Sequence, residues 1–310
     1  MLSLVSAAGS RRPLLESRVR PATLATYKGH ATKFLEFCAL YAVPLRDHAE
    51  LDDTLVAYAE LQRTTRAGFS TLLCAVAFFS PRLPKLAAAH AALKGWSRLT
   101  PTKHTMPMLR VFTLAIAIRL AALGWADAGS GLIVQHVLLL RPSELLALRR
   151  EDVLLPEEAP VYAGARKLFL TLGTPAWGTK VGRRQVVSTA DPLAISAMRR
   201  LVAHKQRGQL VFDFTYDQYR RRLMSAASEL GLAALSYSPH SPRAGGATQL
   251  FIDGSSVPAI QESGRWASAL TCKVYIDGAV ALATTTAVYA QPYLPLLSLR
   301  TLPPALGEPG

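Results

Sequence analysis

Cysteine is scarce in this chain of 310 residues, which contains only Cys38, Cys74 and Cys272. An odd number of thiols cannot pair completely into disulfides, and these spacings match no pattern of metal ligands. The scarcity excludes a disulfide-stabilised secreted domain and predicts reduced thiols in an intracellular protein.

Long hydrophobic runs are also missing. The most apolar region, residues 111–140, is interrupted by Arg119, Asp127 and His136, whereas a membrane span needs roughly 18–20 clean apolar residues. We therefore expect neither a transmembrane helix nor a membrane partner. Half of the residues are nonetheless apolar, which allows a sizeable core and argues against general disorder.

Acidic residues are few, with 21 Asp and Glu against 35 Lys and Arg, and the formal net charge is +14 at pH 7. Residues 1–110 contain 15 basic and 7 acidic residues, and residues 111–310 contain 20 and 14. An excess of this sign is typical of proteins that bind nucleic acid or an anionic membrane surface. Because neither a span nor a basic amphipathic anchor appears, we expect nucleic acid, although a basic protein without such a partner is the alternative. Charge in both halves suits a protein that grips its partner from two sides.

The first hundred residues predict a small helical domain. Residues 1–21 form a basic N-terminal arm, for which a transit peptide is the alternative. Apolar residues then recur at helical spacing across residues 22–98, and residues 99–107 form a proline-containing linker. The predicted helices cover residues 22–42 with Thr23 as N-cap, the stretch after Asp52 and Asp53 to Gln62, residues 67–79 and residues 85–96.

Basic side chains recur on the exposed faces of these helices. A run of charge is often only a solvated surface, but the repeated positive sign favours contact with a nucleic-acid backbone. The candidates for DNA-backbone contact are Lys28, Lys33, Arg63, Arg66, Lys94 and Arg98.

Residues 108–290 predict a second, mixed domain, so the fold class is mainly α with a small β-sheet (α+β). Two short strands, 167–172 and 184–188, flank a loop rich in glycine. The tail, residues 291–310, is rich in proline and leucine, and we expect it to be irregular from Pro292. The predicted helices cover residues 108–124, 128–140, 192–205, 217–230, 241–253, 257–263 and 266–276.

One arginine precedes a short helix. Pro142 suits the first position of a helix, so Arg141 lies at its start, and Leu145, Leu146 and Leu148 anchor the helix in the core. A surface arginine is the plainer interpretation, but a guanidinium on a rigid element can bind two phosphate oxygens. Glu144, one helical turn later, is placed to hold that guanidinium.

Other segments carry a histidine, a second arginine, a lysine and a tyrosine. His240 and Arg243 are three residues apart on one predicted helix, followed by small residues that allow close backbone approach. Lys180 lies in the glycine-rich turn, where it can deliver a proton. Trp266 precedes Tyr275 by nine residues, and a phenol can act as a nucleophile, although a core tyrosine is commoner.

The order Arg141, Lys180, His240, Arg243, Trp266, Tyr275 resembles that of the tyrosine recombinase (phage integrase) family. The resemblance covers about residues 108–290 and includes Leu-Arg-Pro-Ser-Glu-Leu-Leu-Ala-Leu, His-Ser-Pro-Arg-Ala-Gly-Gly-Ala and Gly-Arg-Trp. It implies a catalytic domain over this range, and the helical region 22–98 is similar to the core-binding domain of the family.

The resemblance also implies a role for each residue. Tyr275 would attack a scissile phosphate and form a 3′-phosphotyrosyl link, while Arg141 and Arg243 would bind the non-bridging oxygens. Lys180 would protonate the departing 5′ oxygen, His240 would assist proton transfer, Trp266 would brace the phosphate and Glu144 would support Arg141. The implied partner is double-stranded DNA, bound by a dimer to tetramer of this chain in the compartment that holds the DNA, with no metal, cofactor or small-molecule ligand.

Several alternatives stay open. Pro242 departs from the family pattern, but the first turn of a helix tolerates it, which places His240 near the N-cap. Lys167 and Arg183 are rivals to Lys180, and Tyr289 is a rival to Tyr275. The leucines of the tail suit either docking on a neighbouring protomer or packing on their own chain. A type IB topoisomerase-like enzyme and a decayed DNA-binding protein of the same fold are alternatives for the function.

Overall fold

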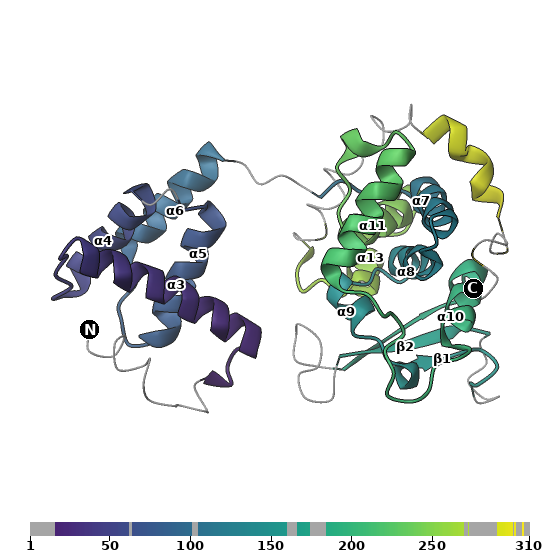
Figure 1. Cartoon of the computed structure of the whole chain (residues 1–310), viewed down its shortest axis with the longest axis horizontal. Helices are drawn as coiled ribbons and strands as arrows, with labels where there is room; N and C mark the ends of the chain where they lie inside the picture. The colour runs from purple at the N-terminus through teal and green to yellow at the C-terminus, as the bar shows by residue number, and fades with distance from the viewer. Residues whose placement is uncertain are drawn as a thin grey trace. The chain divides into compact units, whose positions relative to one another are not determined.

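The computed structural model describes residues 16–61, 64–100, 105–159, 166–173, 184–269, 272, 290–299, 301 and 306. The chain divides into two compact units, Met1–Lys103 and His104–Gly310 (Figure 1). The division falls within residues 99–107, the stretch predicted as a linker. Each unit has a hydrophobic core of its own.

The first unit is helical in its described part. Helix α5 packs against both α3 and α6, and α6 also packs against α4. These helices surround the buried side chains of Phe34, Leu55, Phe69 and Leu72. The predicted helical periodicity is therefore confirmed. The helices are α3 (Pro21–Leu40), α4 (His48–Leu61), α5 (Arg66–Phe79) and α6 (Ala87–Leu99).

Two predicted helix starts in this unit are wrong. Arg20, not Thr23, is the N-cap of α3, because Pro21 takes the first helical position, where its fixed φ suits the helix. Asp52 lies inside α4, and its buried carboxylate accepts hydrogen bonds from the backbone N–H groups of Ala88 (2.8 Å) and Ala89 (2.9 Å). Asp52 thus caps α6, a neighbour in space, rather than its own helix.

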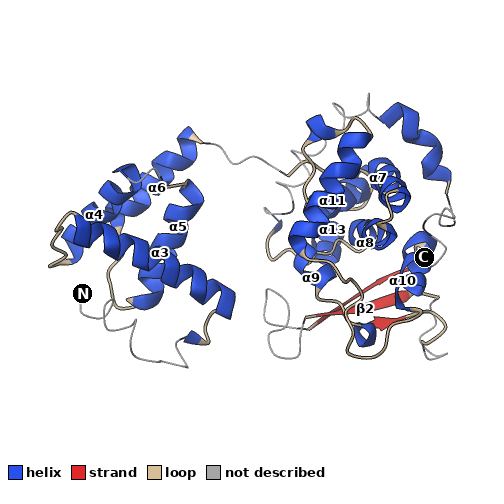
Figure 2. Cartoon of the chain, viewed as in Figure 1, coloured by secondary structure: helices blue, strands red, loops and turns tan. Residues whose placement is uncertain are grey.

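The second unit contains a helical core with the strands gathered along one side of it (Figure 2). Helices α7 and α8 pack side by side, and α10, α11 and α12 cover them. Pro192 follows the N-cap Asp191 of α10, and Gly231 and Gly254, both with positive φ, follow the ends of α11 and α12. No described helix has both the length and the apolar character that crossing a membrane requires. The helices are α7 (Arg110–Ala122), α8 (Ala126–Val137), α9 (Pro142–Leu146), η1 (Arg150–Asp152), α10 (Pro192–Val202), α11 (Tyr216–Glu229), η3 (Ala233–Leu235), α12 (Ser241–Ile252) and α13 (Val257–Gly264).

The sheet has three antiparallel strands in the order β1 (Val153–Leu154), β2 (Leu168–Leu172) and β3 (Gln185–Thr189). In register, Leu170 pairs with Val153 on one side and Val187 on the other. Alternate residues of β2 are buried in the core. Both predicted strands are confirmed, whereas β1 was not predicted, because two residues are too short to show an alternating pattern.

The C-terminal tail is more regular than predicted. Gln291–Ser298 forms the 3₁₀-helix η4, which packs against α7. The hydroxyl of Tyr293 donates to the carbonyl of Leu230 at 3.0 Å, and Leu296, Leu299 and Leu306 join the core of the second unit. The prediction of an irregular tail is therefore wrong for η4, and these leucines pack on their own chain.

Candidate active site

Arg141 lies at the turn between α8 and α9. Pro142 occupies the first position of α9, as predicted, and Arg141 is its N-cap in extended conformation. The Glu144 carboxylate accepts a hydrogen bond from the Arg141 backbone N–H at 2.7 Å and another from its guanidinium at 2.5 Å. The predicted contact between Arg141 and Glu144 is thus present, and it orients the guanidinium on a short, core-anchored helix.

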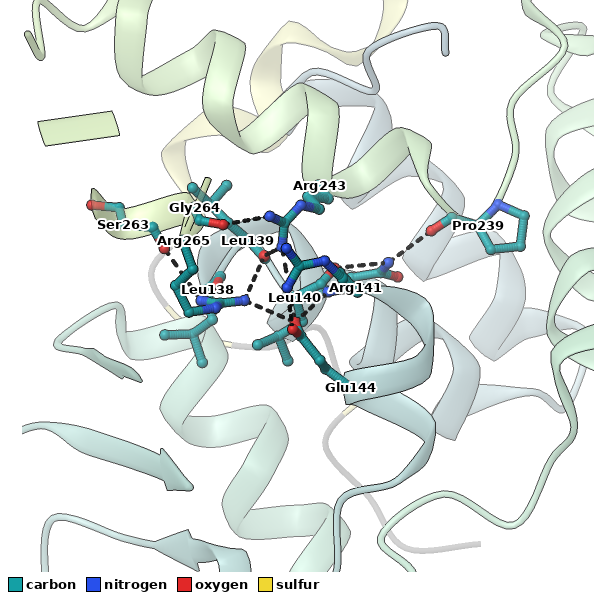
Figure 3. Close-up of polar contacts among 11 residues, drawn as sticks. Leu138, Leu139, Leu140, Arg141, Glu144, Pro239, Arg243, Ser263, Gly264 and Arg265 are labelled. Atoms are coloured by element: carbon teal, nitrogen blue, oxygen red, sulfur yellow. Dashed lines mark hydrogen bonds and ion pairs between the residues drawn. The ribbon is translucent and has the colours of Figure 1, made fainter. Parts of the chain in front are cut away.

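Glu144 is the centre of an arginine cluster that we define as Arg141, Arg243 and Arg265 (Figure 3). Its Oε1 lies 2.5 Å from Arg141 Nη1, and its Oε2 lies 2.8 Å from Arg265 Nη2 and 3.8 Å from Arg243 Nη1. Burial by itself would raise the pKa of Glu144, but Arg265 and Arg141 outweigh it and hold this pKa below its ordinary value. Glu144 is therefore ionised at neutral pH.

Arg243 is held by backbone carbonyls and an aromatic ring. It lies in the first turn of α12, where small residues let the backbone of α12 pass close to its neighbours. Its guanidinium donates to the carbonyls of Leu139 and Gly264 and lies 4.6 Å from the centre of the Trp266 ring, a cation–π contact. A buried cation held in this way has a fixed orientation.

Trp266 lies outside a helix, although the prediction began a helix there. Helix α13 ends at Gly264, and Trp266 packs so closely on Gly264 that a Cβ on this glycine would approach the ring to 1.6 Å. Gly264 is therefore required for the indole to reach Arg243. The predicted residues Arg243 and Trp266 are brought together by this turn.

His240 is the N-cap of α12, as the position of Pro242 predicted. Its side chain is exposed, and it precedes Arg243 on the same element. The segment is tied down by Ser241, whose carbonyl accepts from the N–H of Met108 at 3.0 Å. His240 and Arg141 therefore lie on the parts of the site that solvent reaches, because the Arg141 side chain is 20% exposed against 5% for Arg243.

A buried glutamine joins the two segments that carry these residues. The Gln135 carboxamide donates to the carbonyls of Leu140 (3.2 Å) and Pro239 (2.7 Å), the residues before Arg141 and His240. Its oxygen accepts from the hydroxyl of Tyr219 at 2.8 Å. Gln135 thus connects α8, α11 and the start of α12 through satisfied buried bonds.

The site has an excess of positive charge. Three guanidinium groups surround one carboxylate, and arginine stays charged at any working pH. In a buried setting this excess favours a bound anion, and the planar donors suit the oxygens of a phosphate. The arrangement can therefore bind and polarise a phosphodiester.

Two predicted residues, Lys180 and Tyr275, lie outside the described residues, as do their rivals Arg183 and Tyr289 and the candidate Arg63. Lys167 is exposed just before β2. Of the DNA-backbone candidates, Lys28, Lys33, Lys94 and Arg98 are exposed, and Arg66 is half-buried, with its guanidinium donating to Ser97 at 3.2 Å.

Sequence reasoning missed Arg265 and Gln135. Arg265 stands inside the Gly-Arg-Trp motif, and its charge next to a predicted site residue was a usable signal. Gln135 is a polar residue within an apolar helix, which is also a signal, but neither pattern reveals a partner more than 100 residues away.

No protein-family model and no curated protein match this chain. Solved structures do match it. The post-cleavage complex of the XerH site-specific recombinase bound to palindromic difH substrate is similar with a TM-score of 0.59 and 14% identity, covering 81% of this chain and 75% of that one. The Tn1549 transposon integrase in complex with a circular intermediate DNA is similar with a TM-score of 0.58 and 12% identity, covering 89% of this chain and 94% of that one.

A lambda integrase dimer bound to a core site is similar with a TM-score of 0.56 and 14% identity, covering 89% of this chain and 94% of that one. The fold of this chain is therefore that of the tyrosine recombinases, as the order of its motifs predicted. The mainly α fold with a small sheet is confirmed as well.

Proposed function

We propose that this chain cleaves and rejoins double-stranded DNA through a covalent phosphotyrosine intermediate, as a site-specific recombinase or integrase. The observation that carries the proposal is the arginine cluster on Glu144, beside Trp266 and His240. It occurs in a fold shared with recombinases whose structures hold DNA. A fold alone can serve many functions, whereas the residues of a site limit its chemistry.

The arginine cluster would bind the scissile phosphate. Arg141 and Arg243 supply planar donors for the two non-bridging oxygens, and the Trp266 N–H supplies a further donor. Negative charge grows on these oxygens when phosphorus becomes five-coordinate, so fixed cations stabilise the transition state more than the ground state. Because Glu144 and the backbone carbonyls already orient the cations, little reorganisation is needed during the reaction.

The proposed reaction has two matching steps. Tyr275 Oη attacks phosphorus and loses its proton with the help of His240, while the bond from phosphorus to the 5′ oxygen breaks and that oxygen receives a proton from Lys180. The strand is then held as a 3′-phosphotyrosyl ester. A 5′ hydroxyl reverses the same step, which restores Tyr275 and closes the backbone.

The first unit would hold DNA through its backbone. Lys94 and Arg98 are four residues apart on α6 and share one exposed face, and Lys33 is exposed on α3. A variant that neutralises one phosphate fewer has a plot of log K against log salt concentration that is less steep by about 0.9. We expect Lys94→Glu to weaken binding to all sequences and to flatten this slope.

The same proposal includes second copies of this chain on the DNA, from dimer to tetramer. The lambda integrase structure is a dimer on its core site, and joining two duplexes needs more than one active site. Sedimentation of protein–DNA complexes at increasing protein concentration measures this number directly. Complexes that stay at one protomer per site would contradict it.

A nicked-duplex trapping assay tests the proposal without a known target site. The duplexes carry a randomised sequence upstream of the nick and a label at the 5′ end of the strand to be cleaved. Cleavage near the nick releases a short oligonucleotide that diffuses away, so the labelled strand stays joined to the protein on a denaturing gel. Sequencing the trapped strands then identifies the target.

The outcomes of this assay distinguish cleavage by Tyr275, cleavage by Tyr289 and binding without cleavage. We expect an adduct that Tyr275→Phe abolishes and Tyr289→Phe retains. If only Tyr289→Phe abolished the adduct, Tyr289 and not Tyr275 would be the nucleophile. Binding that weakens steeply with salt, without any adduct from the wild-type chain, would support a non-cleaving DNA-binding protein instead.

A further inference from the structure

Arg265 takes part in the arginine cluster although it lies outside the six residues of the proposed reaction. It follows α13 in the left-handed conformation, with φ 56° and ψ 43°. The N–H of Trp266 closes the end of the helix on the carbonyl of Gln261 at 3.0 Å. Glycine adopts this conformation freely, whereas a residue with a Cβ adopts it at a cost in free energy. The contacts of the Arg265 side chain can offset this cost, which glycine would not incur.

The guanidinium of Arg265 is divided between a carboxylate and the end of α8. Its Nη2 donates to Glu144 Oε2 at 2.8 Å and to the carbonyl of Leu139 at 3.0 Å (Figure 3). Its Nη1 donates to the carbonyl of Leu138 at 3.4 Å and to that of Ser263 at 3.2 Å. A cation is favoured there, because the last carbonyls of a helix lack helical partners and carry negative partial charge.

The carbonyl of Leu139 also accepts a hydrogen bond from Arg243. Leu139 is a second non-glycine residue in the left-handed conformation, with φ 49°, and its carbonyl accepts from both Arg243 and Arg265. Thus α8 and α13 both end in a left-handed residue at the cluster. Uncommon backbone conformations that gather at one site are a reason to infer function there.

The burial of Arg265 also has a free-energy cost. The Nε–H of Arg265 is buried and has no hydrogen-bond partner within the described part of the chain, and a buried unpaired donor is unfavourable. The Arg265 side chain is 7% exposed, against 20% for Arg141. Its place is behind the more accessible Arg141, which is the place of a residue that orients others.

We propose that Arg265 is a positioning residue of the cleavage site, which holds Glu144 Oε2 and Leu139 so that Arg141 and Arg243 stay directed at the scissile phosphate. This inference rests on the proposed function. Arg265 and the Arg141 backbone N–H hold Oε2, while the Arg141 guanidinium holds Oε1. Without Arg265, Glu144 Oε2 loses the hydrogen bond from this buried cation and keeps the one from the Arg141 backbone N–H, so the carboxylate is held less firmly.

The test measures the rate of adduct formation on a duplex selected by the trapping assay. We expect Arg265→Gln to slow cleavage about 10- to 100-fold, by analogy with the loss seen when groups that orient metal ligands are removed. Arg265→Lys keeps the charge and should recover part of this loss. The control is Ser236→Gly. Ser236 is an exposed residue in the left-handed conformation, with φ 49°, and it is not part of the arginine cluster. The Ser236→Gly chain should cleave like the wild type.

A double-mutant cycle shows whether Arg265 acts through Glu144. If it does, Glu144→Gln combined with Arg265→Gln slows cleavage no more than Glu144→Gln alone. Losses that multiply in full would overturn positioning through Glu144, since Arg265 would then act independently of this carboxylate. Cleavage by Arg265→Gln at the wild-type rate would overturn it too.

The pH profile separates positioning from a merely structural role. Glu144 faces Arg141, Arg243 and Arg265, and a small cavity beside it is also lined by Arg149, Glu151, Asp152 and Arg184. Without Arg265 the carboxylate is easier to protonate, so the Arg265→Gln rate should fall more steeply than the wild-type rate as pH is lowered. Arg265→Lys should restore the wild-type profile.

Folding and function are kept apart by the design. Thermal melting and salt-dependent DNA binding verify that each variant is folded. If Arg265→Gln does not fold, Arg265→Lys decides, with slower cleavage expected at unchanged DNA binding and an unchanged rate overturning the inference. A wild-type chain that forms no adduct would overturn the proposed function itself.

Discussion

Gln135 Nε2 donates to the carbonyl of Pro239 at 2.7 Å, across 104 residues of sequence. The same amide reaches the carbonyl of Leu140, so one buried side chain sets the spacing between the segments of Arg141 and His240. The bonds of Gln135 are internal to the protein and involve neither the cluster arginines nor the imidazole of His240.

Replacing Gln135 should impair both stability and cleavage. Gln135→Met leaves the carbonyls of Leu140 and Pro239 and the hydroxyl of Tyr219 without this partner, which costs about 3 kcal/mol of unfolding free energy. We also expect cleavage at least about tenfold slower, because a small displacement of catalytic groups is costly. Denaturant unfolding and the adduct rate measure the two effects.

Tyr219→Phe is the matched control for this prediction. It removes the hydrogen bond from the Tyr219 hydroxyl to Gln135 but leaves the carbonyls of Leu140 and Pro239 paired with Gln135. We therefore expect a loss of about 1 kcal/mol in unfolding free energy and unchanged cleavage. If both variants slowed cleavage equally, the role of Gln135 would be general stability.

Trp266 offers a separation between stacking and hydrogen bonding. Trp266→Phe keeps an aromatic face for Arg243 and removes the indole N–H, so we expect a loss of about 1 kcal/mol in stability and at least about tenfold in cleavage. Trp266→His supplies a ring N–H again and should recover cleavage. A Trp266→Phe chain that cleaves normally would limit Trp266 to holding Arg243.

The close approach of Met108 to α12 predicts a severe effect of one methyl group. A Cβ on Gly245 would lie 1.7 Å from the carbonyl oxygen of Met108, which forces the backbone to move. Gly245→Ala should therefore lower the free energy of unfolding by about 3 kcal/mol or more.

Gly95→Ala in α6 is the matched substitution with the opposite effect. Its Cβ meets no atom within 4 Å, so it should stabilise its helix by about 0.5–1 kcal/mol. Hydrogen exchange of amides in α12 and α6 measures each effect in its own unit.

His136 predicts a loss of stability in mild acid. Burial, with Arg110 nearby and Asp191 opposing, lowers the pKa of His136 from 6.5 to about 4, and its ring contacts the Thr113 hydroxyl at 3.1 Å. The folded state therefore keeps His136 neutral while the unfolded chain gains a proton below pH 6.5. Stability should fall by about 2 kcal/mol between pH 7.5 and pH 5 from this residue, and the loss should level off below pH 4.

Denaturant unfolding at several pH values measures how steeply the free energy of unfolding changes with pH. His136→Asn cannot titrate, so its stability should depend less on pH over the same interval, whatever its absolute value. His204→Asn, which removes an exposed histidine, should keep the wild-type slope. Equal slopes in all three proteins would contradict the assignment.

Much of the fold follows from local sequence. Helical periodicity, Pro142 and Pro192 at first helical positions, and glycines after α11 and α12 all act through neighbours a few residues away. The Arg141–Glu144 contact belongs to this class, because a separation of three residues at a helix start brings the side chains together.

Other features could not be predicted because their partners are distant in sequence. Asp52 resembles an N-cap but satisfies the start of α6, since any nearby carboxylate can pair with the free N–H groups of a helix. The composition of the tail predicts an irregular segment, yet burial of Tyr293 and Leu296 against α7 supports η4. Such outcomes depend on which apolar surfaces meet.

The sequence by itself determined the types and order of the candidate site residues, and the tyrosine recombinase fold that they indicate. Only the tertiary structure decided that Arg243 and Arg265 share one carboxylate with Arg141, and that Gln135 connects the segments of Arg141 and His240. The physical reason is that chain-local rules set backbone direction over a few residues. Pairing of buried charges depends instead on packing between helices that are far apart along the chain.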